Sequence, residues 1–519
     1  MSFYRILKGY YMSKTLYTSV LISKSGLPVP VFSDGHTMHS RYDPVREADK
    51  TASLMKDGSF FLVAGIGGAY LIQAVRRLHP ESVILAAENS RKDIEFLKRI
   101  PSFLDISADK KIIIFPVENT ARMLLRYYLP CVYGSLGIVE HQSWAAENVS
   151  GIVEFRKQVD EASRIISADF SVQAHFGRIW QRNICMNLKN YCPPVDISFP
   201  LNKTALIAAA GPSLDSTVSY ITGNRDSLYV VATDTAFGSF VKRGIHCDAV
   251  VSIDGQEISH NHFMELDDTV SGTLFVFDLC ANPAAVRAVR KRGCGILFVH
   301  TGHPLSQYAS QYSERLGNGA FMQLDSGAGT VTIAAADFAA KAGFSNIAAA
   351  GADFSYLNGK SYMKGTYLDA LYNTESCRIF PCETAFDRLL FRTQLIPYKD
   401  YAGRFTTAVL QSYDAAFENW ADSNNLRKDE RDFLKFCRTE HPESSPVSSA
   451  KSFDISSFTK QLKSDFSSVD FSSLLPGEFP PVLLSLIPAA ASFRINAPEK
   501  DSNFEALANL AYSEILRYN

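Results

Sequence analysis

Six short apolar runs between residues 205 and 351 constrain the fold of this chain more than any other feature of its sequence. Each run is continuously apolar rather than alternating, and helical patterns separate the runs. Strands buried on both faces have this composition, because the helices of βα units cover both faces of a parallel sheet. We therefore predict an α/β protein with a central Rossmann-like parallel sheet. The runs are ALIAAA (205–210), LYVVAT (228–233), AVVSI (249–253), TLFVF (273–277), GILFV (295–299) and NIAAAG (346–351).

Glycine or polar residues follow the predicted strands, at the edge where open parallel sheets bind ligands. A single aspartate in such a position is as often a turn or helix-capping residue. Six strand ends of this kind in succession indicate an active face. The residues are Gly211, Pro212 and Ser213; Asp234 and Thr235; Asp254 and Gly255; Asp278; His300 to His303; and Gly351 to Asp353.

Two loops of small residues lead into helices on this face. In the first, Gly211 allows close backbone approach and Pro212 suits a first helical position, where a missing N–H costs nothing. The free N–H groups of such a helix start attract anions, although a tight turn with a purely structural role explains the same residues. The second loop contains Ser326, Gly327, Gly329 and Thr330. Together the loops predict a cradle for a phosphate-bearing substrate.

A loop rich in hydroxyl and ammonium groups follows the last apolar run. It carries Tyr356, Lys360, Tyr362, Lys364 and Tyr367. These groups could hold an anionic ligand. The alternative is a surface hairpin in which the tyrosines only pack.

The N-terminal part contains a separate βαβ pattern. FFLVAGIGGAYLIQAVRRL is a strand, a glycine-rich turn and a helix, and Glu88 ends the next strand, 88 − 67 = 21 residues after Gly67. This approaches a dinucleotide or S-adenosylmethionine fingerprint, with glycines near the ligand and an acid for ribose hydroxyls. However, Tyr70 occupies the place of the third glycine. The pattern therefore favours a Rossmann-like domain with a structural role.

The polar segment from His39 to Ala48, HSRYDPVREA, has two interpretations. Asp43 before Pro44 is typical of a capped helix start. The same segment could serve as a docking element between domains.

The length of 519 residues allows two or three domains. We predict an N-terminal Rossmann-like α/β domain at 1–150, a helical linker at 151–200 and a central domain at 201–400. A C-terminal helical region at 401–519 follows, and its Ser-rich stretch at 440–475 predicts a mobile linker.

Composition excludes several classes of protein. The net charge of −2 argues against a general nucleic-acid binder, which would have a basic balance. No apolar run has transmembrane length and no secretory signal is recognisable, which predicts a cytoplasmic protein that does not contact membranes. Nine cysteines without a CxxC pair are typical of reduced thiols.

Several of these motifs together resemble the bacterial motility-associated factor (Maf) family of flagellin glycosyltransferases. They are Ala210 to Leu214, Ser326 to Thr330, Gly351 to Phe354, Asn358 to Tyr362, the Ser23 to Gly26 turn and the His39 segment. The resemblance covers about residues 20–400. That family has a "domain of unknown function 115" core, which is similar to the GT-A-like fold of bacterial sialyltransferases.

The resemblance implies transfer of a nonulosonic acid, of the pseudaminic or legionaminic type, from a CMP-activated donor to Ser or Thr hydroxyls of flagellin. It implies a role in flagellar assembly and motility, and no metal or cofactor beyond the CMP-sugar as co-substrate. By the same resemblance, Gly211, Pro212 and Ser213 match the first nucleotide loop. Ser326, Gly327 and Thr330 match the loop near the sugar and cytidine, and Tyr356 and Tyr362 match the tyrosines that hold the CMP phosphate. Sialyltransferases often have Asn where this chain has Asp234.

The chain departs from the family at the general base. Related proteins place a histidine shortly after the tyrosine loop, but here the next histidine is His441. We predict His303 as the substitute and Asp254 as the next candidate, since histidine titrates near pH 7. The alternative for His303 is a structural, hydrogen-bonded histidine.

Two other functions remain open. Archaeal 6-hydroxymethylpterin diphosphokinases share this core, and in that case Asp234, Asp254 and Asp353 would hold Mg²⁺ and the phosphates of ATP. That hypothesis explains the carboxylates but neither the N-terminal domain nor the tyrosine loop. The third possibility is a non-catalytic factor that binds flagellin during assembly.

Overall fold

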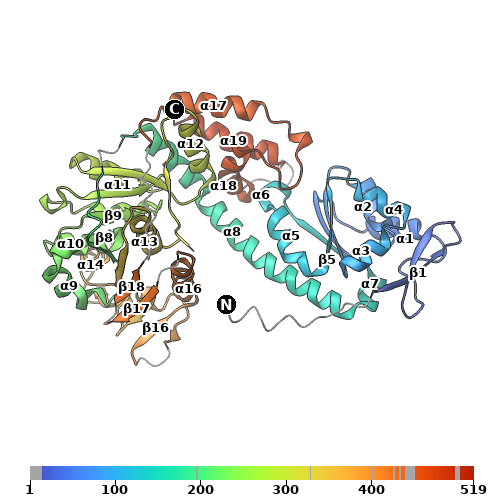
Figure 1. The fold of residues 1–519 in the computed structure, drawn as a ribbon, viewed down its shortest axis with the longest axis horizontal. Helices are drawn as coiled ribbons and strands as arrows, with labels where there is room; N and C mark the ends of the chain where they lie inside the picture. Colours follow the sequence, from blue (N-terminus) through green and yellow to red (C-terminus); the bar gives the residue numbers. More distant parts are fainter. Residues whose placement is uncertain are drawn as a thin grey trace. The chain divides into compact units, whose positions relative to one another are not determined.

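The computed structural model describes residues 15–193, 197–327, 329–398, 402–424, 427–431, 434–438, 450–496 and 503–518 (Figure 1). The chain forms two compact units. The first unit consists of Met1–Gly177, Ser468–Leu483 and Ile487–Ala511. The second consists of Arg178–Ser467, Leu484–Leu486 and Tyr512–Asn519.

The first unit is built on a four-stranded parallel sheet in the order β5-β4-β3-β6. Every residue of β3 and β4 is buried, as their unbroken apolar sequences predict. This confirms the smaller N-terminal α/β domain. Its elements include β1 (Tyr17–Ile22), β2 (Pro28–Phe32), α1 (Pro44–Ala52), β3 (Phe60–Ala64), α2 (Tyr70–Leu78), β4 (Val83–Glu88), α3 (Arg91–Leu97), α4 (Pro101–Ser107), β5 (Ile112–Pro116), α5 (Thr120–Tyr127), α6 (Pro130–Tyr133), β6 (Leu136–Glu140) and α7 (Gln142–Glu147).

The second unit contains a nine-stranded sheet in the order β12-β11-β10-β9-β8-β7-β13-β18-β17. Strands β7 to β13 are parallel, whereas β18 and β17 are antiparallel additions at one edge. All six predicted apolar runs form strands. The strands are β7 (Thr204–Ala208), β8 (Leu228–Thr233), β9 (Ala249–Ser252), β10 (Leu274–Asp278), β11 (Gly295–His300), β12 (Met322–Gln323), β13 (Asn346–Ala350), β17 (Arg427–Arg431) and β18 (Leu434–Arg438).

The order of the parallel strands creates a topological switch point. The chain places β8 to β12 successively on one side of β7 and then returns to place β13 on the other side. Open parallel sheets commonly bind their ligands at such a switch point, outside the carboxyl ends of the strands. This is where the Gly211 and Gly351 loops lie.

Helices cover the sheet and position its loops. Helix α13 packs against β7, β8, β9 and β13, and its alanines are buried, which lets the helix approach the strands closely. Because α13 leads into the parallel strand β13, it runs antiparallel to the strands, and its N-terminus lies at the carboxyl edge. The elements include α9 (Leu214–Gly223), α10 (Asp234–Lys242), η3 (Glu257–Phe263), α11 (Pro283–Lys291), α12 (Pro304–Arg315), α13 (Val331–Lys341), β14 (Tyr356–Leu357), α14 (Tyr367–Thr374), α15 (Cys382–Leu390), β15 (Ile396–Pro397), β16 (Arg404–Thr406) and α16 (Ala408–Ser423).

The predicted domain boundaries are wrong at two places. Residues 151–200 do not form a mere linker, because α8 (Val149–Lys189) is a single 41-residue helix whose residues belong to both units. The C-terminal region is also divided between the units. Its segment 468–483 and 487–511 belongs to the first unit, where Arg494 of α18 (Pro481–Asn496) donates from Nε to the Cys131 carbonyl at 2.8 Å.

The Ser-rich stretch is folded where the structure describes it. Helix α17 (Ile455–Ser467) buries Phe458, Leu462 and Phe466, which repeat every four residues and so form one apolar stripe. Tyr308 donates to Asp465 Oδ2 at 2.5 Å and ties this helix to α12. The serine content predicts a mobile linker, but residues 455–467 form a helix because its apolar stripe can be buried. Residues 440–449 of the predicted linker lie outside the described residues.

Within the described ranges, no helix combines the length and the apolar character needed to cross a membrane. The eight cysteines whose side chains are described are free thiols.

Candidate functional site

Asp234 is fixed at the carboxyl end of β8, where it is the first residue of α10. Its Oδ1 accepts hydrogen bonds from Thr235, at 2.7 Å from the backbone N and 3.1 Å from Oγ1. Its Oδ2 accepts one from Ser252 Oγ of β9 at 2.8 Å. The residue is only 3% exposed. These bonds hold a carboxylate in one orientation at the centre of the carboxyl edge.

Asp254 follows β9 and lies within electrostatic reach of Asp234. Burial raises the pKa of Asp254, and the like charge of Asp234 adds to the rise, whereas the Gln256 N–H bond and His262 act in the opposite direction. A neighbouring negative charge disfavours the ionised form of a carboxyl group, which is the contribution of Asp234 to the raised pKa of Asp254. The two aspartates therefore make this part of the carboxyl edge acidic.

Two tyrosines of the tyrosine loop lie within electrostatic reach of these carboxylates. Burial of its hydroxyl raises the pKa of Tyr362, Tyr356 and Asp234 add to the rise, and Arg392 opposes it, although 37% of the residue surface is exposed. The pKa of Tyr367 rises to about 12, through burial first and then through neighbours that include Tyr362, Asp254 and Asp234. Tyrosines with raised pKa values stay protonated at neutral pH. Their hydroxyls are therefore available as neutral hydrogen-bond donors.

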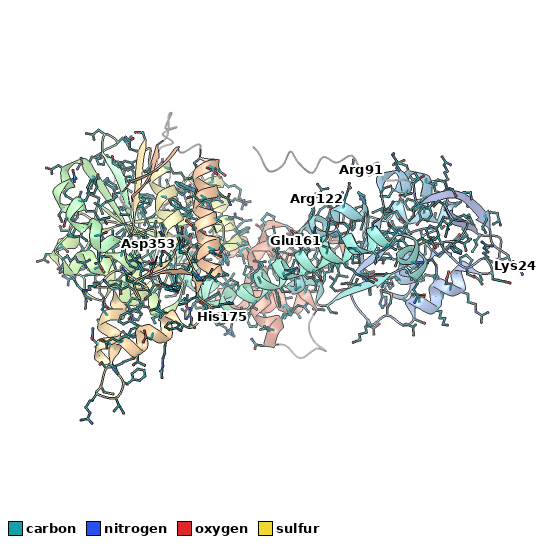
Figure 2. All side chains as sticks on the ribbon, turned by 90° about the horizontal axis from the view of Figure 1, so that it is seen from below. Lys24, Arg91, Arg122, Glu161, His175 and Asp353 are labelled. Carbon is teal, nitrogen blue, oxygen red and sulfur yellow. The ribbon has the colours of Figure 1, made fainter. Side chains whose placement is uncertain are left out.

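The Gly211 loop does not offer the free N–H groups that its sequence predicts. The Ser213 N–H donates to Asp353 Oδ2 at 2.8 Å, and the Ser213 hydroxyl donates to Oδ1 at 2.5 Å (Asp353 is labelled in Figure 2). Helix α9 starts at Leu214, so Pro212 lies in the turn before it rather than at its first position. The prediction of an anion site at Ser213 is wrong in this respect, because a carboxylate of the chain already occupies it.

The two glycines at the switch point serve close packing. A Cβ on Gly211 would lie 2.3 Å from the Gly351 carbonyl oxygen and 2.4 Å from Asp353 Oδ2. A Cβ on Gly351 would lie 2.4 Å from the Ala209 carbonyl oxygen. The loop nevertheless borders the candidate site, since the Met363 N–H donates to the Ala210 carbonyl at 2.9 Å and ties the tyrosine loop to it.

The second small-residue loop reaches the same edge of the sheet through α13. Thr330 caps this helix by accepting from the Thr332 N–H at 3.3 Å, and the Ser326 carbonyl accepts from Gly329 and Thr330 at 3.0 Å. Gly327 and Gly329 are exposed and have φ angles of 54° and 88°. Ala328 lies outside the described residues. That this loop binds the sugar and cytidine stays a prediction.

His303 is not brought to this group of residues. It follows β11, three strands from β8, which corresponds to about 14 Å at the usual strand spacing. Its Nδ1 accepts from the Leu305 N–H at 3.1 Å as the cap of α12, and its ring packs edge-on against Trp180. Its Nε2 is buried without a hydrogen-bond partner among the described residues. These contacts are those of a structural histidine.

The burial of His303 predicts acid sensitivity of the second unit. Burial lowers the pKa of His303 to about 3, below the usual 6.5 of an unfolded chain. Between these values the unfolded state binds the extra proton, so stability falls as pH falls, by about 1.4 kcal/mol per pH unit for one such group. His303→Asn keeps a good helix cap and removes this titration. Urea unfolding at pH 7 and pH 5 should therefore show a smaller loss for the variant than for the wild type; an equal loss would contradict the assignment.

In the glycine-rich loop of the first unit, side chains of the protein also accept the hydrogen bonds of the backbone N–H groups. Glu88 Oε2 accepts from the N–H groups of Ile66 at 3.0 Å and Gly67 at 3.4 Å, and its Oε1 accepts from Trp144 Nε1 at 2.6 Å. The Gly68 N–H donates to His39 Nε2 at 2.7 Å. Among these described residues no N–H of the turn is left for a phosphate. The arrangement supports the structural interpretation over nucleotide binding.

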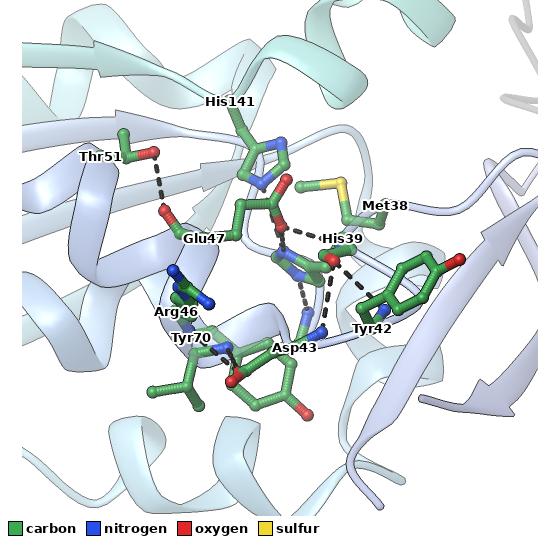
Figure 3. Close-up of polar contacts among 12 residues, drawn as sticks. Met38, His39, Tyr42, Asp43, Arg46, Glu47, Thr51, Tyr70 and His141 are labelled. Atoms are coloured by element: carbon green, nitrogen blue, oxygen red, sulfur yellow. Dashed lines mark hydrogen bonds and ion pairs between the residues drawn. The ribbon is translucent and has the colours of Figure 1, made fainter. Parts of the chain in front are cut away.

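The His39 segment is a capped helix start (Figure 3). Asp43 Oδ1 accepts from the N–H groups of Val45 at 3.1 Å and Arg46 at 3.0 Å. Glu47 Oε2 accepts from the Ser40 N–H at 2.8 Å and so closes the turn from the other side. This confirms the first of the two interpretations.

The same segment brings together a set of metal-ligand side chains. His39 Nδ1 lies 3.2 Å from His141 Nε2 and 4.0 Å from Glu47 Oε2. A neutral imidazole has one lone pair, and that of His39 already accepts the Gly68 N–H at Nε2. Its Nδ1 must therefore carry the proton, which it donates to His141. The cluster is a chain of hydrogen bonds from Gly68 through His39 to His141. It does not fit a metal ion, because His39 has no lone pair left to bind one.

Within the described part of the chain, one other group offers three potential metal ligands: Asp34, His36 and Glu147. All three lie at the surface of the first unit, and His36 Nδ1 pairs with Asp34 at 2.5 Å and with Glu147 at 3.1 Å. Neither group includes the carboxylates of the second unit.

A pocket of about 240 Å³ opens beside the tyrosine loop. His262 and Tyr367 stand on its wall, with ring centroids 4.6 Å apart at 87°. His262, Arg392 and Tyr372 are not among the residues that the sequence predicts, because only the folded conformation of their segments brings them to this site. The pair of histidines in SHNHF, just after Asp254, is the signal that could have identified His262. The pocket is lined by Phe237, Gly238, Val241, Lys242, Asn261, His262, Met264, Glu265, Tyr367, Ala370, Leu371 and Thr374.

A known family model covers the part of this site that carries Asp234, Asp254 and His262. Residues 181–359 match the family model "6-hydroxymethylpterin diphosphokinase MptE-like". The match confirms the predicted core that Maf proteins and pterin diphosphokinases share. A solved Maf glycosyltransferase from Magnetospirillum magneticum AMB-1 aligns with a TM-score of 0.49 at 12% identity, over 98% of this chain and 87% of that chain.

Two uncharacterized proteins of Treponema pallidum (strain Nichols) are similar over shorter segments. One is 38% identical over 144 residues, which are 28% of this chain and 49% of that protein, so the match spans about half of its length. The other is 34% identical over 145 residues, which are 27% of this chain and 69% of that protein. The chain therefore belongs to the same family as this second Treponema pallidum protein, and its second unit carries an MptE-like domain.

Proposed function

We propose that the protein is a glycosyltransferase that moves a nonulosonic acid, of the pseudaminic or legionaminic type, from a CMP-activated donor to Ser or Thr hydroxyls of flagellin in the cytoplasm. One observation carries the proposal: Tyr362 and Tyr367 lie within electrostatic reach of Asp234 at the carboxyl edge of the sheet, and Tyr356 lies within reach of Tyr362. The resemblance of the loops to the Maf family supplies the donor and acceptor classes.

The residues fit the departure of a nucleotide phosphate. As the bond between the anomeric carbon and the phosphate oxygen breaks, negative charge develops on the leaving group. Neutral tyrosine hydroxyls stabilise such charge without taking up a proton themselves. Tyr362 is the principal donor in this proposal, and Arg392 supplies a positive charge near it and Tyr356. Charge stabilisation of this type needs no metal and suits an inverting displacement.

Other predicted residues complete the proposed binding site. Asp234 and Thr235 face the nucleotide from the start of α10. Ser326, Gly327, Gly329 and Thr330 approach the sugar from the start of α13. Gly211, Pro212, Ser213, Gly351 and Asp353 shape the border of the site, because their own contacts satisfy the Ser213 donors.

The description of the matching family model favours a second candidate, a pterin diphosphokinase. Asp234 and Asp254 are the kind of oxygen ligands that Mg²⁺ prefers. Asp353, the third carboxylate of that hypothesis, already accepts two hydrogen bonds from Ser213. The tyrosine cluster has no role in that reaction.

Calorimetry distinguishes the candidates. We expect the full-length protein to bind CMP without Mg²⁺ and to show no comparable response to ATP–Mg²⁺. Tight binding of ATP–Mg²⁺ without a response to CMP would contradict the glycosyltransferase. Intact-mass analysis of flagellin co-expressed with this protein and a nonulosonic acid pathway then tests transfer. Complex formation without added mass would favour the non-catalytic flagellin-binding factor.

A further inference from the structure

His262 lies beside the end of the tyrosine loop, which contains no histidine of its own. It belongs to η3, the segment after Asp254, and its ring meets that of Tyr367 edge-on at 4.6 Å. Tyr367 is the first residue of α14, directly after the tyrosine loop. A side chain from the β9 connection thus reaches the position that the sequence leaves without a base.

The ring of His262 is available for proton transfer. It is half-buried, and among the described residues neither of its nitrogens has a hydrogen-bond partner. The other histidines of this region differ. His260 Nδ1 is bonded to the Glu257 carbonyl at 2.6 Å, and His303 Nδ1 caps α12. His262 therefore combines an unoccupied lone pair with a place beside the site.

Asp254 provides the charge that an imidazolium needs. The charge interaction with His262 acts to lower the pKa of Asp254, so the two side chains lie within electrostatic reach of each other. Tyr367 lies within reach of the same carboxylate. A histidine near a carboxylate is a common arrangement of a general base that accepts a hydroxyl proton.

The pocket provides an approach to this ring between α10 and α14. Its lining is mainly apolar, with Phe237, Val241, Met264 and Leu371 on three different elements. The charged residues of its lining, Lys242 and Glu265, pair with each other at 3.0 Å. Such a surface suits an uncharged segment of polypeptide better than an anionic nucleotide sugar.

We propose that His262 is the proton acceptor of the transfer reaction and that the acceptor Ser or Thr reaches it through this pocket. The inference rests on the proposed glycosyltransferase function. The hydroxyl oxygen forms a bond to the anomeric carbon while the bond from that carbon to the CMP phosphate breaks. The electron pair of the broken bond goes to the phosphate oxygen. The hydroxyl proton goes to a ring nitrogen of His262 and is then released to water.

The test compares His262→Gln with His260→Gln in the full-length protein. The control removes a histidine two residues away on the same segment. CMP binding is measured by calorimetry, and turnover is measured as CMP release from CMP-N-acetylneuraminic acid with flagellin as acceptor. Intact mass of flagellin co-expressed with each variant and a nonulosonic acid pathway gives a second measure of transfer. We expect both variants to bind CMP like the wild type, and His262→Gln to lose transfer by about 10²–10⁴-fold.

The pH profile gives an independent measurement. Removal of the base should abolish the acid limb of the turnover profile, which His260→Gln should retain. If His262→Gln lowers the melting temperature, His262→Asn replaces it. Transfer by the His262 variant at the rate of the control, in a background where the wild type is active, overturns the inference alone. A wild type that neither binds CMP nor modifies flagellin overturns the proposed function, and this inference with it.

Discussion

Replacing Gly177 with alanine is expected to destabilise the first unit by about 3 kcal/mol or more, in the range of severe core substitutions. A Cβ at this position of α8 would lie 1.7 Å from the carbonyl oxygen of Pro488 and 2.2 Å from its carbonyl carbon. The contact is with the backbone of α18, which cannot rotate away as a side chain can. The two helices of this unit would have to separate along their whole contact.

Gly223→Ala is the matched control. Gly223 is the last residue of α9, and nothing lies within 4 Å of a Cβ built there. Alanine at a helical position without a clash is neutral or stabilises by up to about 1 kcal/mol. Urea unfolding followed by circular dichroism measures both variants. A change below about 0.5 kcal/mol for Gly177→Ala would contradict the close approach of the two helices.

The contact at Gly177 illustrates which part of the fold the sequence predicts and which part it does not. The apolar runs predict the strands of the second unit, because burial on both faces requires that composition. Nothing local predicts that Pro488 returns to Gly177, since the two are more than 300 residues apart. The same holds for Arg494 and Cys131. The division of the C-terminal region between two units was therefore missed.

A similar limit applies to the two glycine-rich turns. In both units the turn lies at the switch point of a parallel sheet, and in both a carboxylate of the chain occupies its N–H groups: Glu88 in the first unit and Asp353 in the second. The residue pattern of such a turn is the same whether its donors are free or satisfied internally. The sequence could predict the turn but not its occupant, because the occupant comes from another strand.

The candidate site was predicted in part. Asp234, Asp254 and the tyrosine loop follow strands, so the parallel topology alone brings them to one edge. His262 reaches the site through the conformation of a connection, and Arg392 through the helical hairpin after the tyrosine loop. Such positions depend on tertiary packing. The predicted base, His303, also follows a strand, but its strand is too far along the sheet.

Among the residues proposed to stabilise the leaving group, the largest effect on function is expected for Tyr362→Phe. Transfer should fall by about 10²–10³-fold, or about 3–4 kcal/mol in transition-state stabilisation, as for the loss of one oxyanion donor. CMP binding should change much less, because the hydroxyl donates most strongly when charge develops on the leaving phosphate. Phenylalanine keeps the ring and its packing. The measurements are the turnover number for CMP release and the dissociation constant of CMP.

Tyr220→Phe serves as the control, since Tyr220 is an exposed tyrosine of α9 and lies outside the tyrosine loop. Equal turnover of Tyr362→Phe and Tyr220→Phe would remove Tyr362 from the mechanism.

The pH dependence of turnover adds a second criterion for the role of Tyr362. Because burial and neighbouring Tyr356 raise the pKa of Tyr362, its hydroxyl keeps the proton beyond the usual value near 10. The wild type should thus retain leaving-group assistance throughout the neutral and mildly alkaline range, and the rate deficit of Tyr362→Phe should be constant there. A deficit that disappears as pH rises from 7 to 9 would indicate that Tyr362 ionises in this range, and that it cannot be the neutral donor on which the mechanism depends.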